Sequence, residues 1–407
     1  LYNSLMINLS LNKKVIFFGF IFTFFSSFGQ SFFLGLFNAP IRNELDISHG
    51  QFGTIYASAT ICSSLLLIWI GKKIDDYRLL YYSFFVVLLL SISSLLFSFI
   101  NSIYFLAVGI FLMRFSGQGL MSHTSTTAIS RFFDKSRGKA LSTIWFGLST
   151  AEFVLPVFIT YLLFLYSWRS VWQGIALLIL ILLPLIIYKC IKTIKLDSRE
   201  EEAVGIKKDK IKDWSRLEVV KDYRFYIISL NMLAGPWIIT GIFIYQSFIS
   251  DAKLWSSFAI PKAFMVYSIT SILSLVLSGF LVDKFTSRKL LPIVNIPLLL
   301  SMITLFTLNH EISAYIFLGL IGVSNGLANV LGSSTWAEIY GVKFIGAIKA
   351  LTTALMVFST AFGTALFGIL IDYGFTIENI AFVSGNYIVV SFILLMIFRK
   401  NLEPVKI

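Results

Sequence analysis

The sequence GKKIDDYR at residues 71–78 occurs a second time, as the variant GFLVDKFTSRK at residues 279–289. This repeat is the clearest indication of the fold. The first residues of the two copies are 208 positions apart (279 − 71), and so are their aspartates (283 − 75). That spacing is about half of the 407-residue chain. In each copy an apolar run ends at the glycine, and another begins shortly after the aspartate. The sequence therefore predicts two related halves.

The residue types in both copies suit a junction between two membrane helices. Gly71 and Gly279 would let a neighbouring helix approach closely, because glycine has no side chain. Asp75 and Asp283 lie just outside the apolar runs, where a carboxylate can accept hydrogen bonds from the positive N-terminal end of an adjacent helix. The bases that follow the aspartates in the two copies are Arg78, Lys284, Arg288 and Lys289.

This loop resembles the short cytoplasmic loop of the major facilitator superfamily of secondary transporters, found between helices two and three and again between helices eight and nine. The second copy keeps the family's base as Lys284 but has Thr286 where the family usually has glycine. The first copy departs further, with Asp76 in place of the base. The resemblance implies a cytoplasmic gate motif, in which Asp75 and Asp283 accept hydrogen bonds in the outward-facing state.

Composition places the chain in a membrane. It is 57% hydrophobic and 13% charged, with a mean hydropathy of +0.84, whereas about a quarter of the residues of a soluble domain are charged. The net charge of +12 would suit nucleic acid, but the bases lie in short segments between apolar runs, so we expect no such partner. Cys62 and Cys190 lie in or beside apolar runs, and the three histidines are scattered. We therefore expect no disulfide framework, no metal and no cofactor.

Twelve apolar runs are long enough to span a bilayer at about 20 residues each. We expect an all-α polytopic membrane protein with two pseudo-symmetric six-helix bundles, at residues 1–192 and 223–407, joined by a cytoplasmic linker at 193–222. The first run is too long for a signal-peptide core and is expected to be retained. The runs fall near 15–38, 50–70, 79–100, 103–130, 139–165, 170–191, 225–249, 261–281, 290–308, 312–335, 344–370 and 379–398.

Two further patterns concern the linker and the orientation. Trp214, Leu217 and Val220 have helical spacing, so the end of the linker is predicted to lie along the membrane surface or to form a solvated helix. With the N-terminus inside, Lys and Arg crowd the inner segments, which predicts that both termini are cytoplasmic. We expect a multi-pass monomer in the bacterial inner membrane. The bases of the outer segments are only Arg42, Arg169, Lys253 and Lys262.

Arg114 is the one base that falls clearly inside a predicted span. It lies about 11 residues from the outer end of the fourth run, which is roughly 17 Å deep at 1.5 Å per residue. A guanidinium there costs at least about 2.5 kcal/mol, so it must face a cavity or a partner. The segment RFSGQG at 114–119 resembles the family's fourth-helix arginine motif, which implies a role in proton coupling or substrate binding. The alternative is an arginine that only ties helices together through carbonyl groups.

Glu152 is the second buried charge, at a depth within about 8 Å of Arg114 when both are counted along their helices. We predict that the two pair. Burial disfavours the charged form of Glu152 and Arg114 favours it, so Glu152 is poised to carry a proton. The alternative is a permanent structural ion pair. The fifth run lacks the glycine-proline core of the family's drug antiporters, which argues against drug/proton antiport.

His123 is considered as a proton relay, with a hydrogen-bonded packing histidine as the alternative. A break or kink is predicted at Gly235–Pro236 in the seventh span, where it could expose carbonyl groups to a ligand. Polar or amphipathic residues at plausible midplane depth could line a central cavity, although each could instead make a helix-helix hydrogen bond. These cavity candidates are Gln30, Gln118, Trp237, Gln246, Asn325 and Asn329.

The predicted function is secondary active transport by alternating access, with no enzymatic activity. One fixed cation beside a protonatable carboxylate suits a small organic anion moved with a proton. The segments 132–133, 137–140 and 168–172 resemble the family, and the first two together are similar to its oxalate/formate and monocarboxylate porters. The alternatives are a receptor or a lipid mover on a transporter fold, or an intramembrane enzyme that uses His123, for which the sequence offers no second catalytic group beyond nearby serine and threonine hydroxyls.

Overall fold

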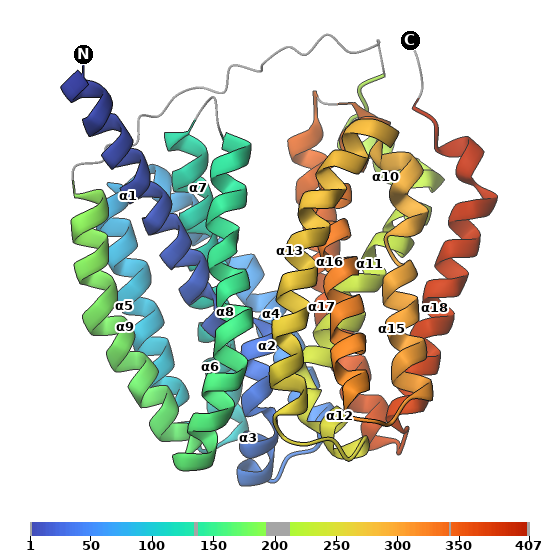
Figure 1. Cartoon of the computed structure of the whole chain (residues 1–407), viewed down its shortest axis with the longest axis horizontal. Coiled ribbons are helices and arrows are strands. Elements are labelled where there is room, and N and C mark those ends of the chain that lie inside the picture. Colours follow the sequence, from blue (N-terminus) through green and yellow to red (C-terminus); the bar gives the residue numbers. More distant parts are fainter. Residues whose placement is uncertain (1, 134–136, 193–211, 342, 405–407) are drawn as a thin grey trace. The chain divides into compact units, whose positions relative to one another are not determined.

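The computed structural model of the chain is helical, and no strand occurs in the residues that it describes (Figure 1). Those residues are 2–133, 137–192, 212–341 and 343–404, and side chains are described for all of them except 2–11, 137, 138, 283 and 333. The predicted all-α class is confirmed.

The chain divides into two compact units. Unit 1 comprises Leu1–Ile47 and Thr54–Glu202, and unit 2 comprises Ser48–Gly53 and Ala203–Ile407. The helices of unit 1 are α1 (Tyr2–Ser26), α2 (Ser31–Leu34), α3 (Asn38–Leu45), α4 (His49–Gly71), α5 (Leu79–Phe97), α6 (Ile103–Met113), α7 (Ser122–Phe132), α8 (Arg137–Leu165) and α9 (Trp168–Ile191), although the first turn of α4 groups with unit 2.

The helices of unit 2 are α10 (Arg216–Lys221), α11 (Tyr223–Ile244), α12 (Gln246–Ala252), α13 (Ala259–Phe285), α14 (Ser287–Leu290), α15 (Ile296–Thr307), α16 (Ile312–Tyr340), α17 (Ile345–Asp372) and α18 (Ile377–Ile397). Hydroxyl side chains begin several helices. Ser102, Ser167 and Thr376 each accept a hydrogen bond from the backbone N–H three residues on, which satisfies a donor that the first helical turn leaves unpaired.

Eleven helices of the described residues are long and apolar enough to span a membrane, and a bent pair, Asn12–Gly29 with Ser31–Leu45, supplies a twelfth. The predicted number and order of spans are therefore confirmed. The first span is interrupted at Gln30, whose backbone is extended (φ −83°, ψ 154°), with a 44° bend between the two parts. The sequence analysis did not anticipate this break.

The predicted break at Gly235–Pro236 does not occur, because α11 continues through Pro236. Proline leaves the carbonyl group of Met232 without its helical donor. The carbonyl groups on either side of it accept hydrogen bonds from outside the helix. The Asn295 amide donates to the carbonyl of Asn231 (2.6 Å), and the Ser359 hydroxyl donates to the carbonyl of Leu233 (3.0 Å). The seventh span is interrupted later, at Tyr245 (φ −102°, ψ 24°).

Helix packing repeats between the units. In unit 1, α1 packs on α8 and α5 packs on α9, which pairs the first span with the fifth and the third with the sixth (Figure 1). In unit 2, α11 packs on α17 and α15 packs on α18, which pairs the seventh span with the eleventh and the ninth with the twelfth. Two helix pairs of unit 1 therefore have counterparts in unit 2 at the positions that the repeat predicts.

The end of the linker packs against unit 2. α10 begins at Arg216 rather than at Trp214, and Ser215 and Glu218 form a capping box at its start. Val219 is fully buried in a cluster with Ile339 and Leu395. One side of α10 is therefore packed in unit 2, whereas Leu217 is exposed, and a location at the membrane surface stays a prediction. Helical spacing could not reveal the packing of Val219, because this residue lies between the spaced residues Leu217 and Val220.

The first turn of α4 is held by other parts of unit 2. The Asp372 carboxylate accepts hydrogen bonds from the backbone N–H groups of His49 (3.0 Å) and Gly50 (2.8 Å). The Tyr245 hydroxyl lies 2.9 Å from the carbonyl oxygen of His49 and 3.0 Å from that of Thr364. A carboxylate at a helix N-terminus satisfies unpaired N–H groups and complements the helix dipole.

Candidate substrate site and repeated loops

Arg114 lies at the start of a π-helical segment, η4 (Arg114–Met121), between α6 and α7. η4 packs against the break in the first span at two glycines. A Cβ atom on Gly117 would lie 2.7 Å from the nitrogen of Gly29 and 2.9 Å from its Cα. Only glycine allows the two backbones to come this close. The position of Arg114 therefore depends on the crossing of Gly29 and Gly117.

The guanidinium of Arg114 is buried and has two neighbours. Nη1 donates a hydrogen bond of 3.0 Å to the carbonyl oxygen of Gly29, which the break leaves without a helical partner. The central carbon lies 5.3 Å from the ring centroid of Tyr56 on α4, in a cation-π contact. Among the described residues, neither Nε of Arg114 nor the buried hydroxyl of Tyr56 has a hydrogen-bond partner. Sequence reasoning missed Tyr56, because nothing in the pattern of α4 marks one aromatic residue among many.

The predicted contact between Arg114 and Glu152 is absent. Glu152 is buried at 8% exposure on α8, and no ion pair within 4.0 Å joins it to a base among the described residues. The depth estimate could not supply the direction in which each side chain points, and Arg114 points toward Gly29 and Tyr56. Glu152 is therefore a buried carboxyl group without a cationic partner in the part of the chain described here.

Gln30 and Gln118 are brought to the same place. Gln30 is the residue at the break of the first span, directly after Gly29. A Cβ atom on Gly29 would overlap the backbone nitrogen of Gln118, so the backbones of the two glutamines lie close together. Both side chains are partly buried. The predicted cavity candidates of the first half thus gather beside Arg114.

The first gate motif is tied to the end of the fourth span within unit 1. His123 on α7 contacts the carbonyl oxygen of Gly71 through Nε2 at 3.0 Å. Asp75 forms an ion pair with Arg131, on the last turn of α7. His123 therefore packs against the motif glycine, which matches the packing alternative considered for it. Arg78 lies over the ring of Tyr81, at 5.5 Å from the centroid.

The second gate motif is tied to the end of the tenth span by the opposite arrangement of charge. Nε of Arg288 lies 3.6 Å from the Glu338 carboxylate on α16, and the backbone N–H of Arg288 donates to the same group. Lys284 lies over the ring of Phe285. A Cβ on Gly279 would meet nothing within 4 Å, unlike one on Gly71. The side chain of Asp283 is outside the described residues.

The cavity candidates of the second half separate in the structure. The Asn325 amide donates to the hydroxyl of Tyr267 (3.0 Å) and contacts that of Ser271 (3.3 Å), so it joins α16 to α13. Asn329, one turn on, is exposed. Trp237 is buried against the rings of Phe362, Phe367 and Tyr387.

Gln246 is also buried, and its amide donates to the carbonyl of Phe243 at 2.9 Å, beside the break at Tyr245. Asn325 and Gln246 thus take the helix-packing role that was the alternative for each of these residues, and Trp237 is packed among aromatic rings.

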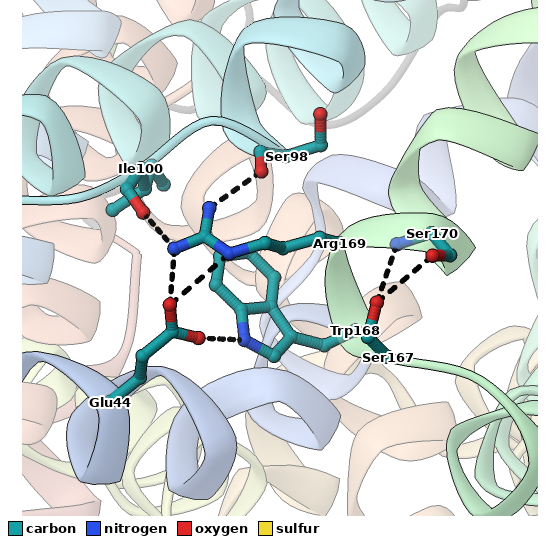
Figure 2. Close-up of polar contacts among 7 residues, drawn as sticks. All are labelled: Glu44, Ser98, Ile100, Ser167, Trp168, Arg169 and Ser170. Atoms are coloured by element: carbon teal, nitrogen blue, oxygen red, sulfur yellow. Dashed lines mark hydrogen bonds and ion pairs between the residues drawn. The ribbon is translucent and has the colours of Figure 1, made fainter.

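A polar clamp closes the opposite end of unit 1 (Figure 2). The Glu44 carboxylate accepts hydrogen bonds from the Trp168 indole (2.7 Å) and from the Arg169 guanidinium. Arg169 also donates to the carbonyl oxygens of Ser98 and Ile100. One arginine therefore ties together the first span, the turn between the third and fourth spans, and the start of the sixth. Trp168 and Arg169, from the family-like segment at 168–172, supply the donors of this clamp.

Comparison with known proteins agrees with the architecture. The model of the Major Facilitator Superfamily matches residues 19–310. A bacterial homologue of the human lysosomal transporter Spinster, in an inward-facing and unoccupied conformation, is 14% identical, with a TM-score of 0.68 over 96% of each chain. The nucleoside transporter NupG is 13% identical, with a TM-score of 0.73 over 96% of this chain and 99% of its own.

At these identities the two structures establish the fold alone, and neither indicates the porter subgroup suggested by the sequence. The family match covers well over half of the chain and points to a membrane transporter rather than an enzyme. Twelve candidate spans, the repeated loop, the repeated helix packing and this match lead to one conclusion: the chain belongs to the Major Facilitator Superfamily.

Proposed function

We propose that the chain is a secondary active transporter that moves a small organic anion, such as a monocarboxylate, by alternating access. The observation that carries the proposal is the buried guanidinium of Arg114. It makes one hydrogen bond to a carbonyl group, and no carboxylate lies within 4.0 Å of it among the described residues. A cation inside a membrane protein is costly unless it is paired. An anionic substrate would supply the missing charge.

Proton coupling is the second part of the proposal, and it rests on Glu152. A charged carboxylate buried without a cation is costly, and binding a proton removes that cost. Arg114 and Glu152 then act separately, with Arg114 holding the anion and Glu152 carrying the proton, rather than as the ion pair that the sequence suggested. We further propose that the protein lies in the bacterial inner membrane as a monomer with both termini in the cytoplasm, as the distribution of bases favours.

The test is uptake into proteoliposomes of purified protein, with labelled lactate and labelled oxalate, with and without an inward proton gradient. Arg114→Gln is expected to abolish uptake, and Arg216→Gln, at an exposed position on α10, is the matched control. Glu152→Gln is expected to keep exchange of internal for external substrate but to lose acceleration by the gradient. Equal rates of uptake by the unmodified protein with and without the proton gradient would contradict proton coupling. Binding of these acids without flux would favour the receptor alternative.

A further inference from the structure

Three buried polar groups of unit 1 have no hydrogen-bond partner within the described part of the chain: Nε of Arg114, the hydroxyl of Tyr56 and the hydroxyl of Thr60. Arg114 is 4% exposed, Tyr56 is fully buried and Thr60 is 2% exposed. Tyr56 and Thr60 are four residues apart, so they lie on one face of α4. The Tyr56 ring is the one that the guanidinium contacts.

Burying such groups without partners is costly. A buried donor without an acceptor destabilises the folded protein, and more so when the donor is charged. A ligand with several acceptor oxygens would remove this cost for all three groups at once. The cluster therefore favours a ligand over simple packing.

The position of the Gly29 bond indicates how a carboxylate would be held. Nη1 of Arg114 donates to the carbonyl oxygen of Gly29. The edge of the guanidinium that carries Nε therefore remains available to a ligand. A carboxylate binds an arginine edge through two parallel hydrogen bonds, so it would be satisfied by Arg114 alone. The hydroxyls of Tyr56 and Thr60 then remain for a different oxygen of the same ligand.

We propose that Tyr56 is a specificity-determining residue of the Arg114 site, and that the site selects acids with a hydroxyl or keto oxygen next to the carboxylate over plain carboxylic acids. The Tyr56 hydroxyl hydrogen-bonds to that second oxygen, and Thr60 supports it one turn away. This inference rests on the proposed function, because it assumes that the substrate carboxylate binds Arg114. It adds the class of acid and the residue that recognises it.

The experiment compares lactate with propionate, which lacks the hydroxyl group. Binding of each is measured by calorimetry on purified protein, for the unmodified chain, Tyr56→Phe, Thr60→Val and the control Tyr82→Phe. Tyr82 is a tyrosine of the same unit whose hydroxyl bonds to the carbonyl of Ile70. Tyr56→Phe keeps the ring against Arg114 and removes an unpaired hydroxyl, so the variant is expected to fold.

The unmodified protein should bind lactate at least about tenfold more tightly than propionate, because a site built to bond a hydroxyl rejects the analogue without it. Tyr56→Phe should weaken lactate to the level of propionate and leave propionate unchanged, and Tyr82→Phe should change neither. Equal binding of both acids by the unmodified protein, or a preference that survives in Tyr56→Phe, overturns the role of Tyr56 while the proposed function stands. Failure to bind either acid overturns both.

Discussion

Arg131 and Glu338 hold the two repeated loops with opposite charges. They are 207 residues apart (338 − 131), the spacing that also separates Gly119 from Gly326 (326 − 119), so they occupy equivalent positions at the ends of the fourth and tenth spans. Arg131 binds the acid of the first loop, Asp75, and Glu338 binds the base of the second loop, Arg288. The repeat therefore conserves the contact between loop and helix end while the polarity is reversed.

This reversal predicts that the charges of Asp75 and Arg131 can be exchanged with each other. Arg131→Glu places like charges together and should lower the thermal midpoint of purified protein, since a partly exposed ion pair contributes about 0–1 kcal/mol to the free energy of unfolding. Combining it with Asp75→Arg should restore most of the loss, as a double-mutant cycle measures. If the loss of stability in the double variant equals the sum of the losses in the two single variants, the two side chains are not coupled.

The crossing of Gly29 and Gly117 predicts a sharp dependence on residue size. Gly117→Ala forces a methyl group against the Gly29 backbone and should cost about 1–3 kcal/mol of stability, the usual range for overpacking. Gly174→Ala on α9 is the matched control, because a Cβ there would meet nothing within 4 Å, and it should be neutral or slightly stabilising. Thermal unfolding in detergent compares them, and equal midpoints for the two variants would contradict the close approach.

The linker helix predicts a dependence on acid. The backbone N–H of Ser215, the Lys212 ammonium and the Ser215 hydroxyl lower the pKa of Glu218 to about 2, whereas an unfolded glutamate titrates near about 4.3. A lowered pKa stabilises the folded segment above the unfolded value, and this contribution is lost as the pH falls from about 4.3 toward 2. Hydrogen exchange at residues 215–221 should therefore lose protection over that window, and Glu218→Gln should remove the pH dependence.

The start of α4 predicts a local effect of one carboxylate. Asp372→Ala leaves the N–H groups of His49 and Gly50 without their acceptor, and loss of a helix cap typically costs about 1 kcal/mol. Exchange at residues 49–53 should accelerate several-fold, while the rest of α4 stays protected. Asp251→Ala, at an exposed position of α12, should leave the exchange of residues 49–53 unchanged. Unaltered exchange in Asp372→Ala would mean that Tyr245 alone holds this turn.

The membrane spans could be predicted because each one is a continuous run of apolar residues in the sequence. The limits of the spans and the repeat follow from apolar length and from the recurring glycine and aspartate, and they match the helices within a few residues. The breaks could not be predicted in the same way. Pro236 suggested one, yet α11 continues through it, while the break after Gly29 lies against Gly117, 88 positions away (117 − 29).

The candidate site was predicted in part for a similar reason. Depth along a helix follows from counting residues, so Arg114 and Glu152 were recognised as buried charges. The direction of each side chain around its helix depends on the π-helical segment and on the carbonyl group freed at Gly29, which are features of the folded packing. Tyr56 was missed because its role is visible only when the guanidinium is placed against its ring.

The boundary between the two units falls inside one continuous helix, between Gly53 and Thr54 of α4. Within unit 2, the first turn of α4 is seated by its glycines. A Cβ atom on Gly50 would lie 2.6 Å from the Asp372 carboxylate, and one on Gly53 would overlap the carbonyl oxygen of Thr364. The consequence is that the turn meets its neighbours through bare backbone, so a single methyl group at either position would displace it.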